Sequence, residues 1–396
     1  MRTVLEGSRA VAEAVALCEP KVIAAYPITP QTHIVEDLAK MKSDGKLKAE
    51  YIESESEFSA LSSIIGASAT GVRVYTATSS QGLALMHEVL FASAGLRLPL
   101  VMTVANRALS APLNIWNDQQ DSISERDSGW IQIYVETNQE AIDSHIHAFK
   151  IAENSKVLLP IMVCMDGFFL THTTEPLDVP EKKDIDKFLP GYVPKYSTLD
   201  PKNPKSIGSF VYPQFYINAR NDIDVALKNS AEAIKEANRD FGKAFGRSYG
   251  DGLIEEYKND KKITIIAMGS VCGAIRDAID LRKDAGLLRV RTYRPFPRDD
   301  LIKKLSGKST VLVLDKAVSL GNSGALFSEV RDALYSAKKS SRSASRNSKP
   351  SEPCSEKPKV VGFIAGLGGK DITTKDINKM IDSAKKMKDG ETEWFE

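Results

Sequence analysis

Short apolar runs alternate in the first 175 residues with longer segments whose apolar positions recur every three or four residues. The run Val22–Ala25, for example, is followed over residues 32–42 by a pattern in which Ile34, Leu38 and Met41 share one helix face. Further strands are predicted in the segments KAEYIESESE, VRVYTATSSQG, LPLVMTVANR, IQIYVE and VLLPIMVCMDG. Because most of these strands are almost continuously apolar, the pattern predicts an α/β fold with a mostly parallel sheet covered by helices on both faces.

The alternation is interrupted between residues 176 and 258, where prolines cluster and NDIDVALKNSAEAIKEANRDFGKAFG has the spacing of a long amphipathic helix. A second alternation starts at KKITIIAMGS, with helices expected at 273–285, 299–305 and 325–337 and strands at 288–292, 310–315 and 360–365. We therefore predict one α/β domain over residues 1–175, a joining extension over 176–258 and a second α/β domain over 259–396. Within the second domain, the Ser- and Lys-rich residues 338–357 are predicted to form a disordered loop.

Composition narrows the class of protein. The chain has 396 residues, of which 42% are hydrophobic and 27% charged, and its net charge is +1. These values are typical of globular domains with large cores, and the near-neutral charge gives no support to nucleic-acid binding. The sequence shows neither an apolar stretch long enough to span a membrane nor a signal peptide, so we expect a cytoplasmic protein.

The cysteines are too widely spaced for the CxxC pairs typical of zinc sites and iron–sulfur clusters; they are Cys18, Cys164, Cys272 and Cys354. We interpret each as a small buried or incidental thiol. We therefore expect no metal site built by this chain alone.

Polar side chains follow the predicted strands at the points where these strands end. The first strand leads into YPITPQT at 26–32, the second into the run ESESE, the third into SSQG at 79–82, and the fourth into Arg107. The carboxyl ends of parallel strands meet at one edge of the sheet, where ligands bind. We therefore expect a guanidinium, carboxylates and hydroxyls to converge there, a set that suits an anionic small molecule and proton transfer.

The run ESESE at 53–57 fits a solvated strand exit as well as a catalytic cluster. Glu57 differs from its neighbours because it opens a helix whose next turns contain small residues, which allow another backbone or subunit to approach closely. The helix dipole stabilises a carboxylate there by about 0.3–1 kcal/mol, whereas burial against a partner raises its pKa. These opposing effects favour a carboxyl group that can share a proton.

Several long motifs resemble the α subunits of the thiamine-diphosphate-dependent 2-oxoacid:ferredoxin oxidoreductase family, in particular those that act on pyruvate. They are YPITPQT, SESEFSALSSIIGASATG, TSSQGLALM, ANRALSAPLNIWNDQQDSISERDSGW and PIMVCMDGFFLTHTTEP. The resemblance extends through RVRTYRPFP and GLGGKDITT, so it covers nearly the whole chain. It implies a thiamine-diphosphate fold of the pyrimidine-binding type for the first domain. The second domain resembles the transketolase C-terminal domain, which in this family is structural or faces coenzyme A.

The resemblance also implies a reaction, the reversible oxidative decarboxylation of pyruvate with coenzyme A to acetyl-CoA and CO₂, with electrons passing to ferredoxin. A β subunit would supply the diphosphate half of the shared thiamine diphosphate site. Mg²⁺ and iron–sulfur clusters are expected in partner subunits, which include γ and ferredoxin-like δ subunits, and this chain alone is expected to be inactive. The alternatives are the same chemistry on 2-oxoisovalerate or 2-oxoglutarate, and a non-catalytic scaffold subunit.

Three residues match family positions with chemical roles. Glu57 matches the glutamate that bonds the aminopyrimidine ring and so makes the cofactor's imino nitrogen available as a base. Thr29, held in a turn that Pro27 and Pro30 stiffen, matches the threonine that bonds the substrate carboxylate or the cofactor. Arg107 matches the arginine that pairs with the 2-oxoacid carboxylate. A scaffold subunit would have no need for this set.

Other assignments are more general. Ser80 and Gln81 are expected to shape the cofactor pocket together with Pro27, and Asn114 is expected to bind substrate. The rest of that segment, with Asp118, Asp121 and Arg126, is expected to line the substrate side or a subunit contact, with a structural role as the alternative.

Two glycine motifs are excluded from the site. GDG at 250–252 resembles the diphosphate and Mg²⁺ motif of thiamine enzymes, but it follows no buried strand and no Asn-Asn pair comes after it. We interpret it as a turn. GLGG at 366–369 is too short for a dinucleotide-binding motif and lacks its acidic partner.

Overall fold

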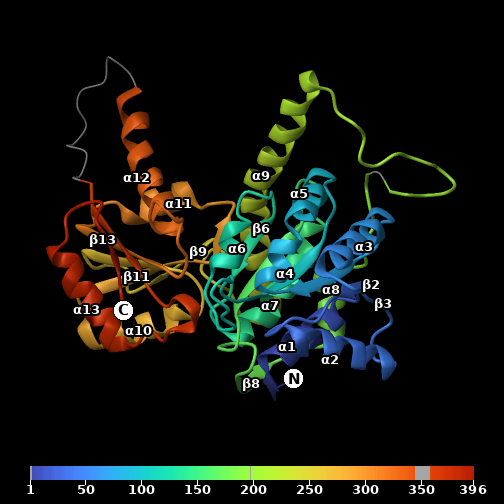
Figure 1. Cartoon of the computed structure of the whole chain (residues 1–396), viewed down its shortest axis with the longest axis horizontal. Helices are drawn as coiled ribbons and strands as arrows, with labels where there is room; N and C mark the ends of the chain where they lie inside the picture. The colour runs from blue at the N-terminus through green and yellow to red at the C-terminus, as the bar shows by residue number, and fades with distance from the viewer. Residues whose placement is uncertain (1, 197, 344–356) are drawn as a thin grey trace.

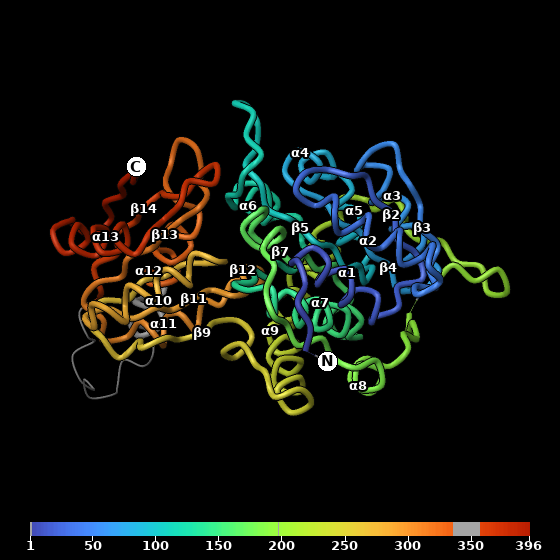
Figure 2. Tube along the Cα trace, turned by 90° about the horizontal axis from the view of Figure 1, so that it is seen from below, coloured from blue at the N-terminus to red at the C-terminus, as the bar shows by residue number. Residues whose placement is uncertain are grey.

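A computed structural model of the chain describes residues 2–196, 198–343 and 357–396. Two α/β lobes lie side by side, the N-terminal lobe coloured blue to green and the C-terminal lobe orange to red (Figures 1 and 2). Within the described residues, the sheets of these lobes have seven and six strands. Both sheets are mostly parallel, which confirms the predicted α/β class.

The seven-stranded sheet has the order β12-β6-β7-β5-β4-β2-β3, and every neighbouring pair is parallel except β12 with β6. Its strands are β2 (Val22–Ala25), β3 (Glu50–Glu53), β4 (Val74–Thr78), β5 (Val101–Asn106), β6 (Ile131–Tyr134), β7 (Ile161–Asp166) and β12 (Thr292–Arg294). The four strands β4 to β7 are buried at every position, which explains their almost continuous apolar character.

Helices cover both faces of this sheet. One face packs on α1 (Gly7–Leu17), α2 (Thr32–Ser43) and α7 (Asn138–Ala152), and the other on α3 (Glu57–Ala69), α4 (Ser80–Leu85), α5 (His87–Gly95) and α6 (Gln120–Ser124). Alternate residues of a strand enter different cores, as in β7, where Ile161 and Val163 face one core and Met162 and Cys164 the other. The second core continues into the C-terminal lobe, so the two lobes share apolar packing.

The six-stranded sheet has the order β15-β14-β13-β10-β11-β9, with only the β11–β9 pair antiparallel among its described strands. Its strands are β9 (Ile254–Tyr257), β10 (Ile263–Ala267), β11 (Ala285–Val290), β13 (Thr310–Asp315), β14 (Lys359–Ile364) and β15 (Thr392–Trp394). Helices α10 (Val271–Arg282) and α13 (Thr374–Lys386) pack on one face, and α11 (Arg298–Leu305) and α12 (Ala325–Ser343) on the other. A short 3-10 helix, η1 (Leu367–Gly369), follows β14.

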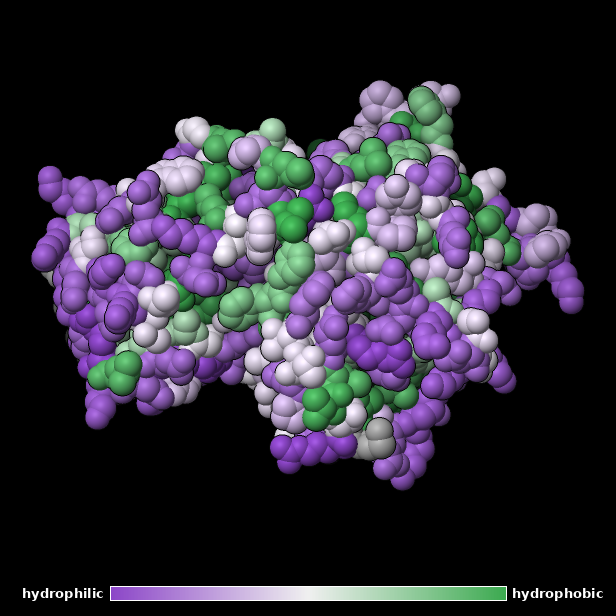
Figure 3. Space-filling model, turned by 60° about the horizontal axis from the view of Figure 1, so that its bottom comes forward, coloured by the Kyte–Doolittle hydropathy of each residue, from purple (hydrophilic) through white to green (hydrophobic). Residues whose placement is uncertain are grey.

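Several segments lie outside the two sheets. Strands β1 (Arg2–Glu6) and β8 (Thr174–Asp178) form an antiparallel pair beside the first sheet, and α8 (Lys182–Phe188) and α9 (Pro213–Phe245) belong to the joining extension. None of the helices in the described ranges is long and apolar enough to cross a bilayer. On the face that Figure 3 shows, hydrophobic residues form several separate patches among hydrophilic ones.

The predicted domain boundaries stay predictions, but three details bear on them. β9 precedes the expected boundary at residue 259 and forms an edge of the second sheet, whereas β12 follows it and belongs to the first sheet. Helix α12 continues to Ser343, within the segment predicted to be a loop. Most of that predicted loop, residues 344–356, lies outside the described residues.

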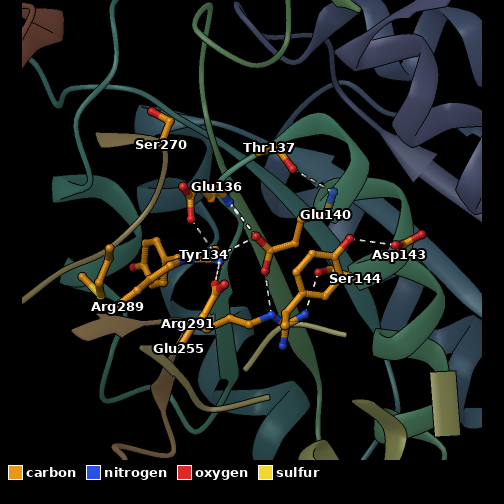
Figure 4. Close-up of polar contacts among 12 residues, drawn as sticks. Tyr134, Glu136, Thr137, Glu140, Asp143, Ser144, Glu255, Ser270, Arg289 and Arg291 are labelled. Carbon is orange, nitrogen blue, oxygen red and sulfur yellow. Dashed lines mark hydrogen bonds and ion pairs between the residues drawn. The ribbon is translucent and has the colours of Figure 1, made fainter. Parts of the chain in front are cut away.

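A buried ion-pair network also joins the lobes (Figure 4). Glu140 of α7 accepts hydrogen bonds from Arg289 Nη2 at 2.6 Å and Arg291 Nε at 2.7 Å, and all three side chains are at most 1% exposed. Arg289 also pairs with Glu136 and Glu255. Although burial raises the pKa of Glu140, the two guanidiniums hold it below its usual range, so this carboxylate stays ionised.

Candidate active site

The structure separates the glutamates of the run ESESE. Glu53 and Glu55 are exposed, whereas Glu57, the first residue of α3, is buried with 6% of its surface exposed. Ser56 caps the helix, because its Oγ accepts a hydrogen bond from the Ser59 backbone N–H at 3.2 Å. The cap fixes the first turn of α3 and therefore the direction in which the Glu57 side chain leaves it.

The Glu57 carboxyl lies against Gly82 of α4. A Cβ atom built on Gly82 would stand 2.5 Å from Glu57 Oε1 and 2.5 Å from Thr78 Oγ1, so only glycine allows this approach. Burial raises the pKa of Glu57 above its ordinary value, opposed by its own backbone N–H. In the described part of the chain, no other residue donates a hydrogen bond to this carboxyl.

Three other polar atoms, at the end of β4 and just after it, also lack partners. Thr78 Oγ1, Ser79 Oγ and Gln81 Nε2 are buried without a hydrogen bond to any described residue. Buried polar groups in native proteins are almost always paired. Unpaired hydroxyls and an amide, clustered at the end of β4 next to a carboxyl, therefore indicate a site for a polar ligand.

Arg107 and Thr29 lie together, as the strand-end pattern predicted. Arg107 Nη1 donates to the Thr29 carbonyl at 3.0 Å, and its Nε donates to the Asn114 carbonyl at 3.0 Å. Arg107 is 8% exposed, whereas Thr29 and Pro27 are exposed. Arg107 Nη2 makes no hydrogen bond within the described residues, so the N–H groups at this edge of the guanidinium can still bind an anion.

The turn that contains Thr29 is held by Gln31, a residue that the sequence did not single out. The fully buried Gln31 donates from Nε2 to the Ala77 carbonyl at 2.7 Å, and its Oε1 accepts from the Ile28 backbone N–H at 3.3 Å. Gln31 thus ties the turn after β2 to the end of β4, which brings the Thr29 and Glu57 segments to the same sheet edge.

Asp121 organises the ends of two strands. Its carboxylate accepts hydrogen bonds from the backbone N–H groups of Ser80 and Arg107, both at 3.0 Å, and from Asn106 Nδ2 and the Ser122 N–H, both at 2.7 Å. Burial raises the pKa of Asp121 to about 7, and these donors oppose the shift. Asp121 therefore positions other site residues, a role more specific than the sequence indicated.

The side chains of Ser80 and Gln81 are hydrogen-bonded to each other at the start of α4. Ser80 Oγ donates either to Gln81 Oε1 or to the Ala108 carbonyl, each at 2.6 Å. The Gln81 amide nitrogen is left without a partner, as described above. These two residues therefore lie where the sequence expected a cofactor pocket, and their roles there stay predictions.

The C-terminal lobe closes one side of the site. Asn114 Nδ2 donates to the Gly368 carbonyl at 3.0 Å, and the Gly368 N–H donates to Asp118 Oδ2 at 3.0 Å. The GLGG motif, which the sequence gave no role, is thus a docking turn with a φ of +60° at Gly368. Arg126 lies apart from this group and lines a groove of about 700 Å³ with residues of α9 and of the segment 294–300, which runs from the end of β12 into α11.

The described cysteines offer no reactive thiol to the site. Cys18, Cys164 and Cys272 are free and buried, and burial raises the pKa of each thiol. Buried thiols of this kind are chemically inert. Cys354 lies outside the described residues.

The fold is that of an α/β protein whose candidate site, a group of buried polar side chains, lies at the carboxyl ends of parallel strands. The family described as pyruvate flavodoxin/ferredoxin oxidoreductase, thiamine diphosphate-binding, matches residues 13–239. The pyruvate:ferredoxin oxidoreductase core domain II matches residues 262–348. The chain therefore belongs to the pyruvate:ferredoxin oxidoreductase family, which confirms the resemblance found in the sequence.

Curated relatives cover nearly the whole chain. Pyruvate synthase subunit PorA of Methanothermobacter thermautotrophicus is 51% identical over 96% of this chain and 94% of its own length. The protein of the same name from Methanocaldococcus jannaschii is 50% identical over 99% and 97%. Ketoisovalerate oxidoreductase subunit VorA of Pyrococcus abyssi is 40% identical over 100% and 98%.

A solved structure shows the same fold. It is the 2-oxoglutarate:ferredoxin oxidoreductase from Magnetococcus marinus with 2-oxoglutarate, coenzyme A and succinyl-CoA bound. The TM-score is 0.69 at 17% identity, and the match covers 97% of this chain. This chain spans 65% of the length of that chain, so the likeness concerns the fold and leaves further segments of the larger chain unmatched.

Proposed function

We propose that this chain is the α subunit of a pyruvate:ferredoxin oxidoreductase. In the complete complex, pyruvate and coenzyme A would give acetyl-CoA and CO₂ while oxidised ferredoxin is reduced, and the reaction would also run in reverse. Two relatives that are 50–51% identical are named for pyruvate, which supports this substrate over the branched 2-oxoacid of the 40% identical relative.

One observation supports the chemistry most directly. Glu57 is a buried carboxyl with a raised pKa and, among the described residues, no hydrogen-bond donor other than its own backbone N–H, and the unpaired hydroxyl of Thr78 at the end of β4 lies close to it. The aminopyrimidine ring of thiamine diphosphate offers the donor and acceptor nitrogens that such a set lacks. The residues present therefore fit the pyrimidine half of this cofactor.

Three residues of this chain would have separate roles in the reaction. Glu57 would share a proton with a nitrogen of the pyrimidine ring, and burial, which raises the pKa of this carboxyl, favours the protonated form that such sharing needs. Arg107 Nη2 would bind the 2-oxoacid carboxylate, oriented by the two carbonyls that its other nitrogens already contact. The Thr29 hydroxyl would bond the same carboxylate or the cofactor. Thiamine diphosphate, when bound, would supply the nucleophilic carbon and accept the electrons of the decarboxylated substrate.

Partner subunits would complete the enzyme. A β subunit would hold the diphosphate and its Mg²⁺, and γ and ferredoxin-like δ subunits, together with β, would provide the iron–sulfur clusters and the contact with ferredoxin. This division agrees with the described cysteines, which are buried and dispersed. We expect the complex to work in the cytoplasm.

The experiment uses the purified complex that contains this chain. Coenzyme-A-dependent reduction of ferredoxin is followed with pyruvate, 2-oxoisovalerate and 2-oxoglutarate as separate substrates. Glu57→Gln should abolish most of the activity while the complex stays assembled and the variant chain stays folded. Glu55→Gln is the matched control, because Glu55 is exposed two residues earlier in the same run.

Each result has a clear meaning. Preference for pyruvate together with loss of activity only in Glu57→Gln would support both the substrate and the acid. Preference for 2-oxoisovalerate would indicate that the substrate is the branched 2-oxoacid for which the VorA relative is named. Equal activity of the two variants would exclude Glu57 from the role proposed here.

A further inference from the structure

Three potential metal ligands meet outside the proposed active site. Glu6 ends β1, His33 lies in the first turn of α2, and His172 lies in the turn between β7 and β8. Their ligand atoms all lie within 4.8 Å of one another. We propose that Glu6, His33 and His172 bind one divalent transition-metal ion of the zinc class.

The donor set favours this class of ion. Two imidazoles and one carboxylate are ligands typical of Zn²⁺, whereas Mg²⁺ and Ca²⁺ prefer oxygen ligands alone. Three protein ligands leave a fourth tetrahedral position for water. Glu6 is half-buried and both histidines are exposed, so an ion can reach all three side chains from solvent.

Contacts around the trio already hold the ligands close together. The His33 and His172 rings lie 4.8 Å apart between centroids, tilted by 35°, and His33 Nδ1 is 2.7 Å from Glu6 Oε1. Phe168 packs on His172 with a centroid distance of 4.8 Å. The Thr171 hydroxyl is 2.7 Å from His172 Nδ1, a second contact that orients the ring and leaves Nε2 for an ion.

The backbone fixes the three segments relative to one another. The Gly7 N–H donates to the Thr173 carbonyl at 3.0 Å, and the Ser8 N–H and hydroxyl donate to the Thr171 carbonyl at 2.9 Å. A Cβ atom on Gly167 would stand 2.6 Å from Pro30 Cγ, so the turn after β7 also packs against the Thr29 turn. A metal ion would therefore cross-link the end of β1, the first turn of α2 and the turn after β7.

The test is a titration of the full-length chain with ZnCl₂ by isothermal calorimetry, after removal of metals with a chelator. Saturable binding of one ion per chain is expected. His33→Ala and His172→Ala should each weaken binding by roughly tenfold or more. His87→Ala is the matched control: His87 pairs with Glu125 at 2.6 Å, but no third ligand joins that pair within the described residues.

A second measurement guards against misfolded variants. Zn²⁺ should raise the thermal unfolding midpoint of the wild type and of His87→Ala, but not that of His172→Ala. Glu6→Gln, which keeps the size of the side chain, should also weaken binding. The proposal is overturned if the wild type binds no Zn²⁺ saturably, or if binding survives unchanged in His33→Ala, His172→Ala and Glu6→Gln.

Discussion

Gly82 approaches Glu57 so closely that a Cβ atom on the glycine would stand 2.5 Å from the Oε1 of the glutamate. The same Cβ would meet Thr78 Oγ1 at 2.5 Å. The position of the Glu57 carboxyl therefore depends on the absence of a side chain at residue 82, and for a reacting group a displacement of about 1 Å can cost about 10²-fold in rate.

Gly82→Ala should therefore lower kcat of the complex by about 10²-fold while the chain stays folded. The reason is that the methyl group must push the Glu57 carboxyl or the β4–α4 turn aside. Gly66→Ala is the control, because a Cβ on this helical glycine would meet nothing within 4 Å. Wild-type rates in Gly82→Ala would show that the carboxyl does not need its present position.

Arg107→Lys should raise KM for the 2-oxoacid on the order of tenfold, with a smaller effect on kcat. A lysine has a single ammonium group and cannot contact the carbonyls of Thr29 and Asn114 while also pairing with a substrate anion. Steady-state kinetics with varied 2-oxoacid would measure the change. Arg97→Lys provides the comparison, because Arg97 also donates to backbone carbonyls, three in its case, but lies elsewhere.

Asp121→Asn should reduce both stability and activity, because the amide cannot accept the four hydrogen bonds that the carboxylate accepts. Leaving buried donors unpaired costs about 1–3 kcal/mol each. Urea unfolding and the ferredoxin-reduction assay would give the two values. Asp127→Asn changes an exposed carboxylate six residues later and should leave both near wild type.

Glu140→Gln should destabilise the full-length chain by about 3–5 kcal/mol, because it leaves Arg289 and Arg291 buried without their shared anion. Glu232→Gln, which removes the charge of an exposed pair with Arg239, should cost less than about 1 kcal/mol. Equilibrium unfolding in urea distinguishes the two. Similar losses in both variants would mean that the buried network contributes little.

The buried His145 should make the folded protein less stable in acid. Its Nε2 accepts from the Thr103 hydroxyl at 2.5 Å, its Nδ1 donates to the Ala141 carbonyl at 2.6 Å, and burial lowers its pKa from 6.5 to about 4. Between these values the unfolded chain binds a proton that the folded chain does not, so stability falls as the pH decreases, by up to about 3 kcal/mol.

The measurement for His145 compares urea unfolding at about pH 7 and about pH 5. The decrease should be smaller in His145→Gln than in the wild type, even if the variant is less stable at both values. The same substitution at exposed His87 is the control. An unchanged decrease in His145→Gln would assign the acid sensitivity to other groups.

The parts of the fold that the sequence predicted best are those with uninterrupted local patterns. The strands at 22–25 and 310–315 have their predicted bounds, because apolar runs there end abruptly in turn residues or charge. The helix expected to end at residue 285 instead ends at Arg282, since Lys283 adopts a left-handed conformation with φ of +66°. Lysine gives no signal of such a cap, unlike glycine.

The segment RVRTYRPFP shows a second reason why the local sequence did not predict every strand. A single strand was expected at 288–292, but β11 ends at Val290 and β12 starts at Thr292 in the other sheet. Arg291, between them, turns toward Glu140, and this contact joins residues far apart in the chain. The reason why the strand is interrupted at Arg291 is therefore not visible in the local sequence pattern.

The sequence predicted that Thr29, Glu57 and Arg107 follow strand ends at one sheet edge, and in the structure they come just after β2, β3 and β5, whereas their roles stay predictions. The relationships that support these residues were not predictable. They depend on how distant segments of the chain pack: Gly82 lies beside Glu57, Gln31 donates to a carbonyl of β4, and donors from separate segments surround Asp121. A pattern along one chain contains no information on such distances until the fold is known.

β12 has a consequence for how the chain is made. Until residues 292–294 have left the ribosome, the outer edge of β6 has no strand to pair with, although the other six strands of its sheet have all been synthesised. An open edge of this kind is a template for pairing with other chains. The nascent protein is therefore most exposed to aggregation between the synthesis of β6 and that of β12, and a fragment that stops at residue 258 would keep this weakness permanently.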